Sequence, residues 1–145
     1  MTAQDLTLTA ITAYRENRGG GAPGMQSVIN VVMNRARTAG HSPYMVCTTH
    51  AQFSSISMPG TEAYLWPKET DPSWVLALQL AAQAAAGKLS DLTGGATLYY
   101  APEAIVTTAH FALPNGQEVP FPTGWNAEAV HFTVAVANQL FFTES

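Results

Sequence analysis

The clearest hydrophobic pattern in the chain lies in residues 22–38. Apolar side chains recur there at i, i+3, i+4, i+7 and i+8, the spacing of one continuous helix face. Pro23 suits the first turn of such a helix, and Arg35 and Arg37 suit its carbonyl end. The sequence therefore predicts an amphipathic helix here. Its apolar positions are Met25, Val28, Ile29, Val32 and Met33.

Two further helices are predicted, one from a weaker apolar stripe and one from residues typical of helix ends. A rough apolar stripe predicts a helix over residues 3–16, which should stop in the glycine-rich stretch 17–21. Asp71 and Pro72 have the character of an N-cap and a first helical residue. The helix that they start should extend through Ala86, because a glycine follows it.

The pattern changes in the last third of the chain. Residues 96–101, ATLYYA, are rich in β-formers and predict a short strand. Residues 128–142 predict a strand, a turn near Ala137-Asn138 and a returning strand, whereas 104–127 reads as irregular. Helices first and a small antiparallel sheet last indicate the α+β fold class.

Residues 39–70 carry several prolines and many Ser and Thr, which predicts a long shaped loop with at most short helical turns. Loops of this length within a compact domain are often functional. The chain has 145 residues and no linker-like composition shift, so we expect a single domain over 1–145. We expect it to act as a monomer.

The low content of charged residues limits the kinds of partner that the protein is expected to bind. Only 11% of residues are charged and the net charge is −4, so a nucleic-acid-binding role is not expected. No apolar run is long enough for a membrane span. The N-terminus lacks the basic and apolar regions of a secretory signal, so we expect synthesis in the cytoplasm without a signal peptide. Low charge leaves neutral, hydroxyl- and amide-rich ligands such as sugars as plausible partners.

Glu16 is the acidic residue whose position indicates chemistry. It should lie in the last turn of its helix, at the negative end of the macrodipole, where the ionised carboxylate is disfavoured and its pKa is raised. A general acid that works near neutral pH needs such a shift. The alternative is a solvated helix-end charge paired with Arg15 or Arg18. A tight pair with either arginine would spoil the acid, so we expect both to point away from Glu16.

The other reactive residues give weaker signals. Cys47 and His50 provide half of a zinc-like spacing, but a structural zinc site needs four ligands, so neither a metal nor a cofactor is expected. A Cys47 nucleophile has no supporting motif nearby. Tyr99 and Tyr100 should point to opposite faces of a strand, one into the core and the other outward or into a groove.

Several blocks, in order, resemble the catalytic domains of the cell-wall hydrolase family of the spore-cortex-lytic enzymes. They cover nearly the whole chain, and five in one order are fairly specific. The blocks are Tyr14-x-Glu16-x-Arg18-Gly19, 33-MNRAR-37, Gln52-Phe53-Ser54, Thr93-Gly94-Gly95-Ala96-x-x-Tyr99-Tyr100-x-Pro102 and Ala137-Asn138-Gln139-x-Phe141.

The resemblance implies a lysozyme-superfamily-like fold and cleavage of peptidoglycan glycan strands between N-acetylmuramic acid and N-acetylglucosamine. It implies a lytic transglycosylase, which leaves a 1,6-anhydromuramoyl end and needs one carboxylate. Glu16 matches the family's catalytic glutamate. By the same matching, the substrate-binding residues are Gln52, Phe53, Ser54, Thr93, Gly94, Gly95, Tyr99 and Tyr100.

The chain departs from the family pattern around the acid. Arg15 stands where the family usually has Gly, Asn17 replaces a small Ala, and Gly20 and Gly21 stand where the family has a second Glu. Two alternatives therefore stay open. One is a hydrolytic muramidase with a second acid such as Glu62 or Asp91, and the other is a non-catalytic glycan-binding or virion structural module.

A bare catalytic domain that acts on the cell wall or in the periplasm without a signal peptide fits a phage endolysin or a component of a phage particle. The glycines after Glu16 suggest that a sugar chain approaches the carboxylate closely.

Overall fold

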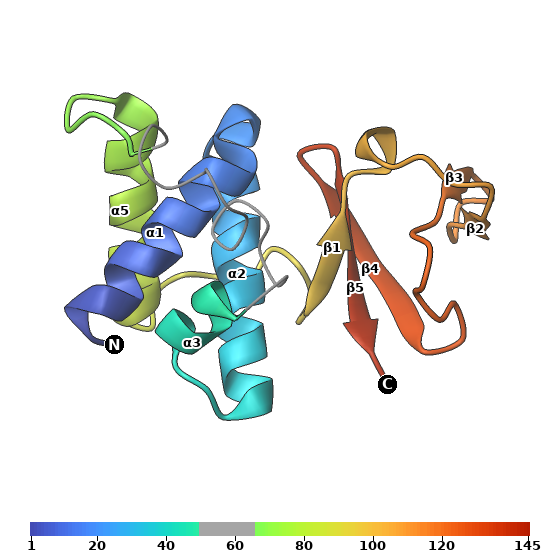
Figure 1. Ribbon diagram of the computed structural model, residues 1–145, viewed down its shortest axis with the longest axis horizontal. Coiled ribbons are helices and arrows are strands. Elements are labelled where there is room, and N and C mark those ends of the chain that lie inside the picture. The colour runs from blue at the N-terminus through green and yellow to red at the C-terminus, as the bar shows by residue number, and fades with distance from the viewer. Residues whose placement is uncertain (50–65) are drawn as a thin grey trace.

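The computed structural model describes residues 1–49 and 66–145. Helices form one side of the molecule and strands the other, with β1 and β5 facing α2 across the middle (Figure 1). The residues expected to bind substrate at 52–54 lie outside the described ranges. In chain order the elements are α1 (Ala3–Asn17), η1 (Arg18–Gly20), α2 (Gly21–Ala39), α3 (Pro43–Thr48), α5 (Pro72–Ala85), β1 (Leu98–Tyr100), η2 (Pro102–Ala104), β2 (His110–Ala112), β3 (Glu118–Pro120), β4 (Val130–Val136) and β5 (Gln139–Glu144).

The three helices expected from the sequence are confirmed, and side chains cap two of them. In α1 the Thr2 hydroxyl accepts from the Asp5 amide at 3.1 Å, while Asp5 accepts from the Thr2 amide at 2.8 Å, a reciprocal capping box. Asp71 caps α5 as predicted, accepting from the Ser73 amide at 2.9 Å. Asp5 also accepts from the amide of Tyr44 at 2.9 Å, which ties α3 to the start of α1. These carboxylates are therefore structural.

The helices pack around a core contributed mainly by α1 and α2, and α3 and α5 cover it. Cys47 is part of this core and is fully buried. Burial raises the pKa of its thiol to about 11. A thiol held neutral in this way is a poor nucleophile. The fully buried members of the cluster are Ala10, Ile11, Ala13, Met25, Val28, Ile29, Val32, Cys47, Ala77 and Ala81.

The C-terminal sheet has the order β1-β5-β4 with both pairings antiparallel. Ala137 and Asn138 both have positive φ, 48° and 65°, at the turn between β4 and β5. Two left-handed residues in a two-residue loop match the twist of the strands that they join. The turn predicted at these residues is confirmed. Phe141 and Phe142 of the central strand β5 are fully buried on opposite faces, one in the seam with α2 and one in the sheet's own core.

The expectation that residues 104–127 are irregular is wrong in part. Strands β2 and β3 form an antiparallel hairpin there, with Phe111 opposite Val119. Each strand has three residues, too short for an alternating pattern to stand out. The Pro114-Asn115-Gly116 stretch is the loop of this hairpin, with Gly116 at φ 87°.

The segment 90–97 is held on α2 by amide side chains. Asn30 donates to the Ser90 carbonyl at 3.1 Å and accepts from the Leu92 amide at 3.0 Å. Asn34 donates to the Ala96 carbonyl at 2.9 Å and to Asp91 at 3.1 Å. These bonds fix the path of the chain from α5 into β1.

Asp91 organises the turn within this segment. Its carboxylate accepts from the amide and hydroxyl of Thr93 at 2.7 and 2.6 Å and from the Gly95 amide at 2.9 Å. Burial alone would raise the pKa of Asp91, but the hydrogen bonds from Thr93, Asn34 and Gly95 outweigh it and lower the pKa. Both oxygens are therefore engaged in holding the loop.

No helix within the described ranges combines the length and hydropathy that a bilayer span needs.

The Asp91→Asn substitution should lower the free energy of unfolding at neutral pH by roughly 1 kcal/mol, because a charged acceptor of several donors becomes a neutral one. The folded-state pKa of Asp91 lies below the ordinary 3.8, so its ionisation stabilises the fold above that value and the contribution is lost as pH falls through the folded-state pKa. Urea denaturation at pH 7 and near pH 3 should show the difference between variant and wild type shrinking in acid. An equal difference at both pH values would contradict this role.

Native Cys47 should react with iodoacetamide at least on the order of 100-fold more slowly than free cysteine at about pH 8, because its thiol is buried and neutral. The measurement is mass spectrometry of the alkylated protein over time. The same reaction in concentrated guanidinium chloride serves as the control and should proceed at the rate of an unstructured peptide. Rapid labelling of the folded protein would disprove the burial.

Candidate functional site

Glu16 lies in the last turn of α1 and its side chain is half-buried. The chain reverses at η1, so α2 runs back along α1 (Figure 1). Side chains tilt toward the N-terminus of their own helix. By this rule Glu16, near the end of α1, and Arg35, near the end of α2, are each expected to lean toward the middle of the helix pair, and the charge of Glu16 does act on the pKa of Arg35.

The corner between α1 and α2 is built around Asn17. Its Oδ1 accepts from the Gly20 amide at 3.1 Å, and its Nδ2 donates to Oε1 of Gln139 in β5 at 3.1 Å. The residue next to Glu16 is thereby bonded directly to the sheet.

The glycines at this corner are needed mainly for packing. A Cβ on Gly20 would lie 2.9 Å from the Cβ of Ala137, and one on Gly24 would lie 2.8 Å from Asn17 Nδ2. Gly21 has φ 64°, a conformation that favours glycine. A Cβ on Gly19, by contrast, would meet no described atom within 4 Å. Of the glycines expected to let a sugar chain approach Glu16, Gly19 is therefore the one whose lack of a side chain is not explained by packing or by a positive φ.

Tyr99 and Arg35 share an electrostatic neighbourhood with Glu16. Tyr99 is half-buried and stacks on Phe141 with ring centroids 5.6 Å apart. Burial raises the pKa of the Tyr99 phenol well above its usual value, and the negative charge of Glu16 raises it further. Burial lowers the pKa of the Arg35 guanidinium, while Tyr99, Glu144, Cys47 and Glu16 oppose that shift. The three groups therefore influence one another electrostatically, across α1, α2 and β1.

The two arginines beside Glu16 lie against aromatic rings. The guanidinium carbon of Arg18 lies 4.7 Å from the Tyr14 ring centroid, and its Nη1 donates to the Tyr14 carbonyl at 3.4 Å. The guanidinium carbon of Arg15 lies 5.6 Å from the ring centroid of Trp66. That both arginines point away from Glu16 stays a prediction.

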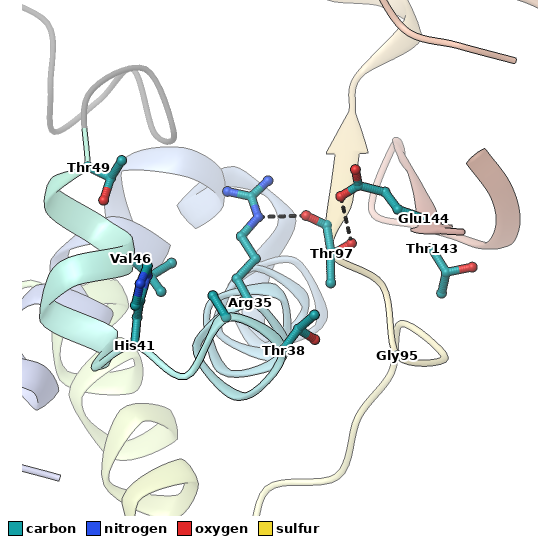
Figure 2. A pocket seen from close by; sticks show the side chains of 10 residues that line it. Arg35, Thr38, His41, Val46, Thr49, Gly95, Thr97, Thr143 and Glu144 are labelled. Atoms are coloured by element: carbon teal, nitrogen blue, oxygen red, sulfur yellow. Dashed lines mark hydrogen bonds between the residues drawn. The ribbon is translucent and has the colours of Figure 1, made fainter. Parts of the chain in front are cut away.

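A cavity of about 580 Å³ opens between the end of α2, α3 and the sheet edge near Thr97. Arg35 enters it from α2 and donates from Nε to the Thr97 carbonyl at 2.6 Å (Figure 2). The Thr97 hydroxyl in turn donates to Oε1 of Glu144 at 3.2 Å. Thr38, His41, Thr49, Gly95 and Thr143 also line it.

The structure separates the predicted substrate-binding residues. Gln52, Phe53 and Ser54 lie outside the described residues, as do Glu62 and His50. Thr93 is fully buried in the loop held by Asp91, so it acts on any ligand only through the shape of that loop.

The remaining four predicted residues each lie in a different setting. A Cβ on Gly94 would lie 3.3 Å from that of Thr133, whereas Gly95 lines the cavity. Tyr99 lies at the seam between helices and sheet. Tyr100 is in the sheet core, where its hydroxyl donates to the Pro120 carbonyl at 2.7 Å. Tyr100 is therefore the core member of the pair, as one of the two was expected to be, whereas a groove at Tyr99 stays a prediction.

Arg35 was not among the site residues predicted from the sequence. It was interpreted there only as a cation that suits the carbonyl end of its helix. The signal was present in the 33-MNRAR-37 block, where Asn34 and Arg35 both reach the segment that leads into β1. Among residues 1–49 and 66–145, no three His, Cys, Asp or Glu side chains gather as a metal site. His110 and His131 are exposed in the strand region, far along the chain from Cys47.

Comparisons with known proteins agree with this architecture. The chain matches the catalytic domain of the germination-specific lytic transglycosylase SleB from Bacillus anthracis with a TM-score of 0.69 and 21% identity. The match covers 99% of this chain and 97% of that one, which shows that the two share a fold and agrees with the expected α+β architecture of helices first and a small antiparallel sheet last. No curated protein sequence matches.

The family model described as Cell Wall Hydrolase matches residues 19–142, which is most of the chain. The matched range begins three residues after Glu16, so it does not include that glutamate. It includes Tyr99 and all the cavity-lining residues, Arg35 among them, except Thr143 and Glu144. The chain belongs to the cell wall hydrolase family of enzymes.

Proposed function

We propose that this protein is a peptidoglycan lytic transglycosylase that cleaves the bond between N-acetylmuramic acid and N-acetylglucosamine, with Glu16 as its general acid and base. The observation that carries the proposal is the position of Glu16. It is half-buried in the last turn of α1, at the seam where Arg35 and Tyr99 also lie, in a member of the cell wall hydrolase family. The similarly folded SleB domain is described as a lytic transglycosylase.

The surroundings of Glu16 suit a group that must both give and take a proton. The carbonyl end of α1 favours the protonated carboxyl. The positive charge of Arg35 favours the carboxylate that forms after proton transfer. Opposed influences of this kind keep either form accessible, which efficient general acid–base catalysis requires.

The reaction needs one carboxyl group. Protonated Glu16 gives its proton to the glycosidic oxygen as the bond from C1 of the muramic acid to that oxygen breaks. The Glu16 carboxylate then takes the proton from the C6 hydroxyl of the same sugar as that oxygen bonds to C1. The products are a free hydroxyl on the departing N-acetylglucosamine and a 1,6-anhydromuramoyl end, and Glu16 is again protonated.

Asp91 is poorly suited to be the second acid of a hydrolytic muramidase. Retaining and inverting glycosidases place a second carboxylate about 5–9.5 Å from the first, facing the sugar. Both oxygens of Asp91 instead accept hydrogen bonds from the loop 91–95 and from Asn34. This occupation favours the scheme with one acid over the muramidase alternative.

The Glu16→Gln substitution should reduce the release of soluble fragments from purified sacculi by roughly 100- to 10,000-fold, because the amide cannot transfer the proton. The matched control is Glu128→Gln, which removes an exposed carboxylate in the segment before β4 and should leave the rate near that of wild type. Melting temperatures of both variants establish that they are folded. Wild-type rates for folded Glu16→Gln would exclude Glu16 as the acid.

Mass spectrometry of the fragments should identify anhydromuramoyl ends, each lighter by one water than the product of hydrolysis. Reducing muramic acid ends would instead indicate a muramidase, and an accompanying loss of activity in folded Asp91→Asn would name its second acid. Tight binding to sacculi with no released fragment would indicate a non-catalytic glycan-binding module.

A further inference from the structure

The cavity between α2, α3 and the edge of the sheet contributes Arg35 to the surroundings of Glu16, but the proposed reaction assigns no occupant to the cavity itself. Its volume of about 580 Å³ is within the usual range of small-molecule sites, roughly 300–1,000 Å³. Helix and strand residues form most of its wall, so its shape is set by the packing of the fold (Figure 2).

Arg35 joins this cavity to the proposed reaction centre. Its Nε is fixed on the Thr97 carbonyl at 2.6 Å, which holds the guanidinium in the cavity wall. The same guanidinium lies within the electrostatic reach of Glu16 and Tyr99. A group that occupies the cavity would therefore contact the same guanidinium that Glu16 influences electrostatically.

The described lining suits a peptide better than a sugar ring. None of its residues is Phe, Tyr or Trp, the flat faces against which the C–H surface of a ring can pack. Instead, threonine hydroxyls and two opposite charges, Arg35 and Glu144, line it. In Figure 2 Thr97 lies between these two charged side chains, bonded to both.

We propose that this cavity binds the peptide stem that muramic acid carries in peptidoglycan, with a stem carboxylate toward Arg35 and a free stem amine toward Glu144. The inference rests on the proposed function, because a muramic acid held at Glu16 presents its stem beside the cleaved bond. A short peptide stem can carry both a carboxylate and an amine. These charges are complementary to the Arg35 guanidinium and the Glu144 carboxylate, which lie on one wall of the cavity. The enzyme should therefore prefer glycan strands that bear stems.

The test compares kcat/KM on soluble glycan strands with stems and on strands from which an amidase has removed the stems. Thr38 is exposed near the end of α2 and lines the cavity, so Thr38→Trp fills part of it. The control, Gln83→Trp, puts the same side chain on an exposed position of α5. We expect wild type and the control to prefer stem-bearing strands, and Thr38→Trp to reduce that preference about tenfold.

Glu144→Gln provides a second arm that does not depend on how the tryptophan packs. It should reduce the preference roughly twofold to fivefold, because Glu144 is exposed and exposed ion pairs are weak. Acetylation of the free stem amines should produce the same reduction with wild type and no additional reduction with Glu144→Gln. This non-additivity is specific to a contact between the amine and Glu144.

Equal wild-type kcat/KM on strands with and without stems would overturn the inference while leaving the proposed function intact. So would a preference that neither Thr38→Trp nor Glu144→Gln changes. Failure of the proposed function is different, because wild type would then release from either kind of strand no fragment at all, or only fragments with reducing muramic acid ends.

Discussion

The hydrogen bonds between α2 and the segment 90–97 are the constraint on which the site depends. Asn34 bonds the Ala96 carbonyl and Arg35 bonds the Thr97 carbonyl, at 2.9 and 2.6 Å. These two adjacent carbonyls immediately precede β1, so they set where the sheet begins relative to the helices. Without them the sheet would have mainly the Asn17–Gln139 bond and the small apolar seam around Val31 and Phe141 to orient it.

The proposed chemistry arises where these attachments bring distant parts of the chain together. Glu16 comes from α1, Arg35 from α2 and Tyr99 from β1, and none is a neighbour of another in sequence. The electrostatic influences of Glu16, Arg35 and Tyr99 on one another link the two helices to the start of the sheet. The Tyr99 phenol is neutral near pH 7 at its ordinary pKa and burial raises that pKa further, so Glu16 and Arg35 are the two of these three groups that can carry charge.

Local signals were enough to predict most of the fold. The apolar stripe of α2, the Asp71 cap and the Ala137-Asn138 turn each depend on a few adjacent residues, and each is confirmed. The β2–β3 hairpin was missed because three-residue strands carry almost no periodic pattern. The burial of Thr93 and the reach of Arg35 to Thr97 depend on tertiary packing, which a single sequence does not encode in its spacing. Glu16 stays a prediction on the grounds of position.

The scarcity of charge makes the few charged groups informative. With 11% of residues charged, most of the surface offers little electrostatic attraction, which suits a neutral glycan that must be bound by shape and hydrogen bonds. Several acidic groups within the described ranges have a structural partner, as Asp5, Asp71 and Asp91 do. Arg35 also has a structural partner, the Thr97 carbonyl, and it lines the cavity as well. Its electrostatic coupling to Glu16 means that, under the two proposals made above, changes at Arg35 should affect cleavage and stem binding together.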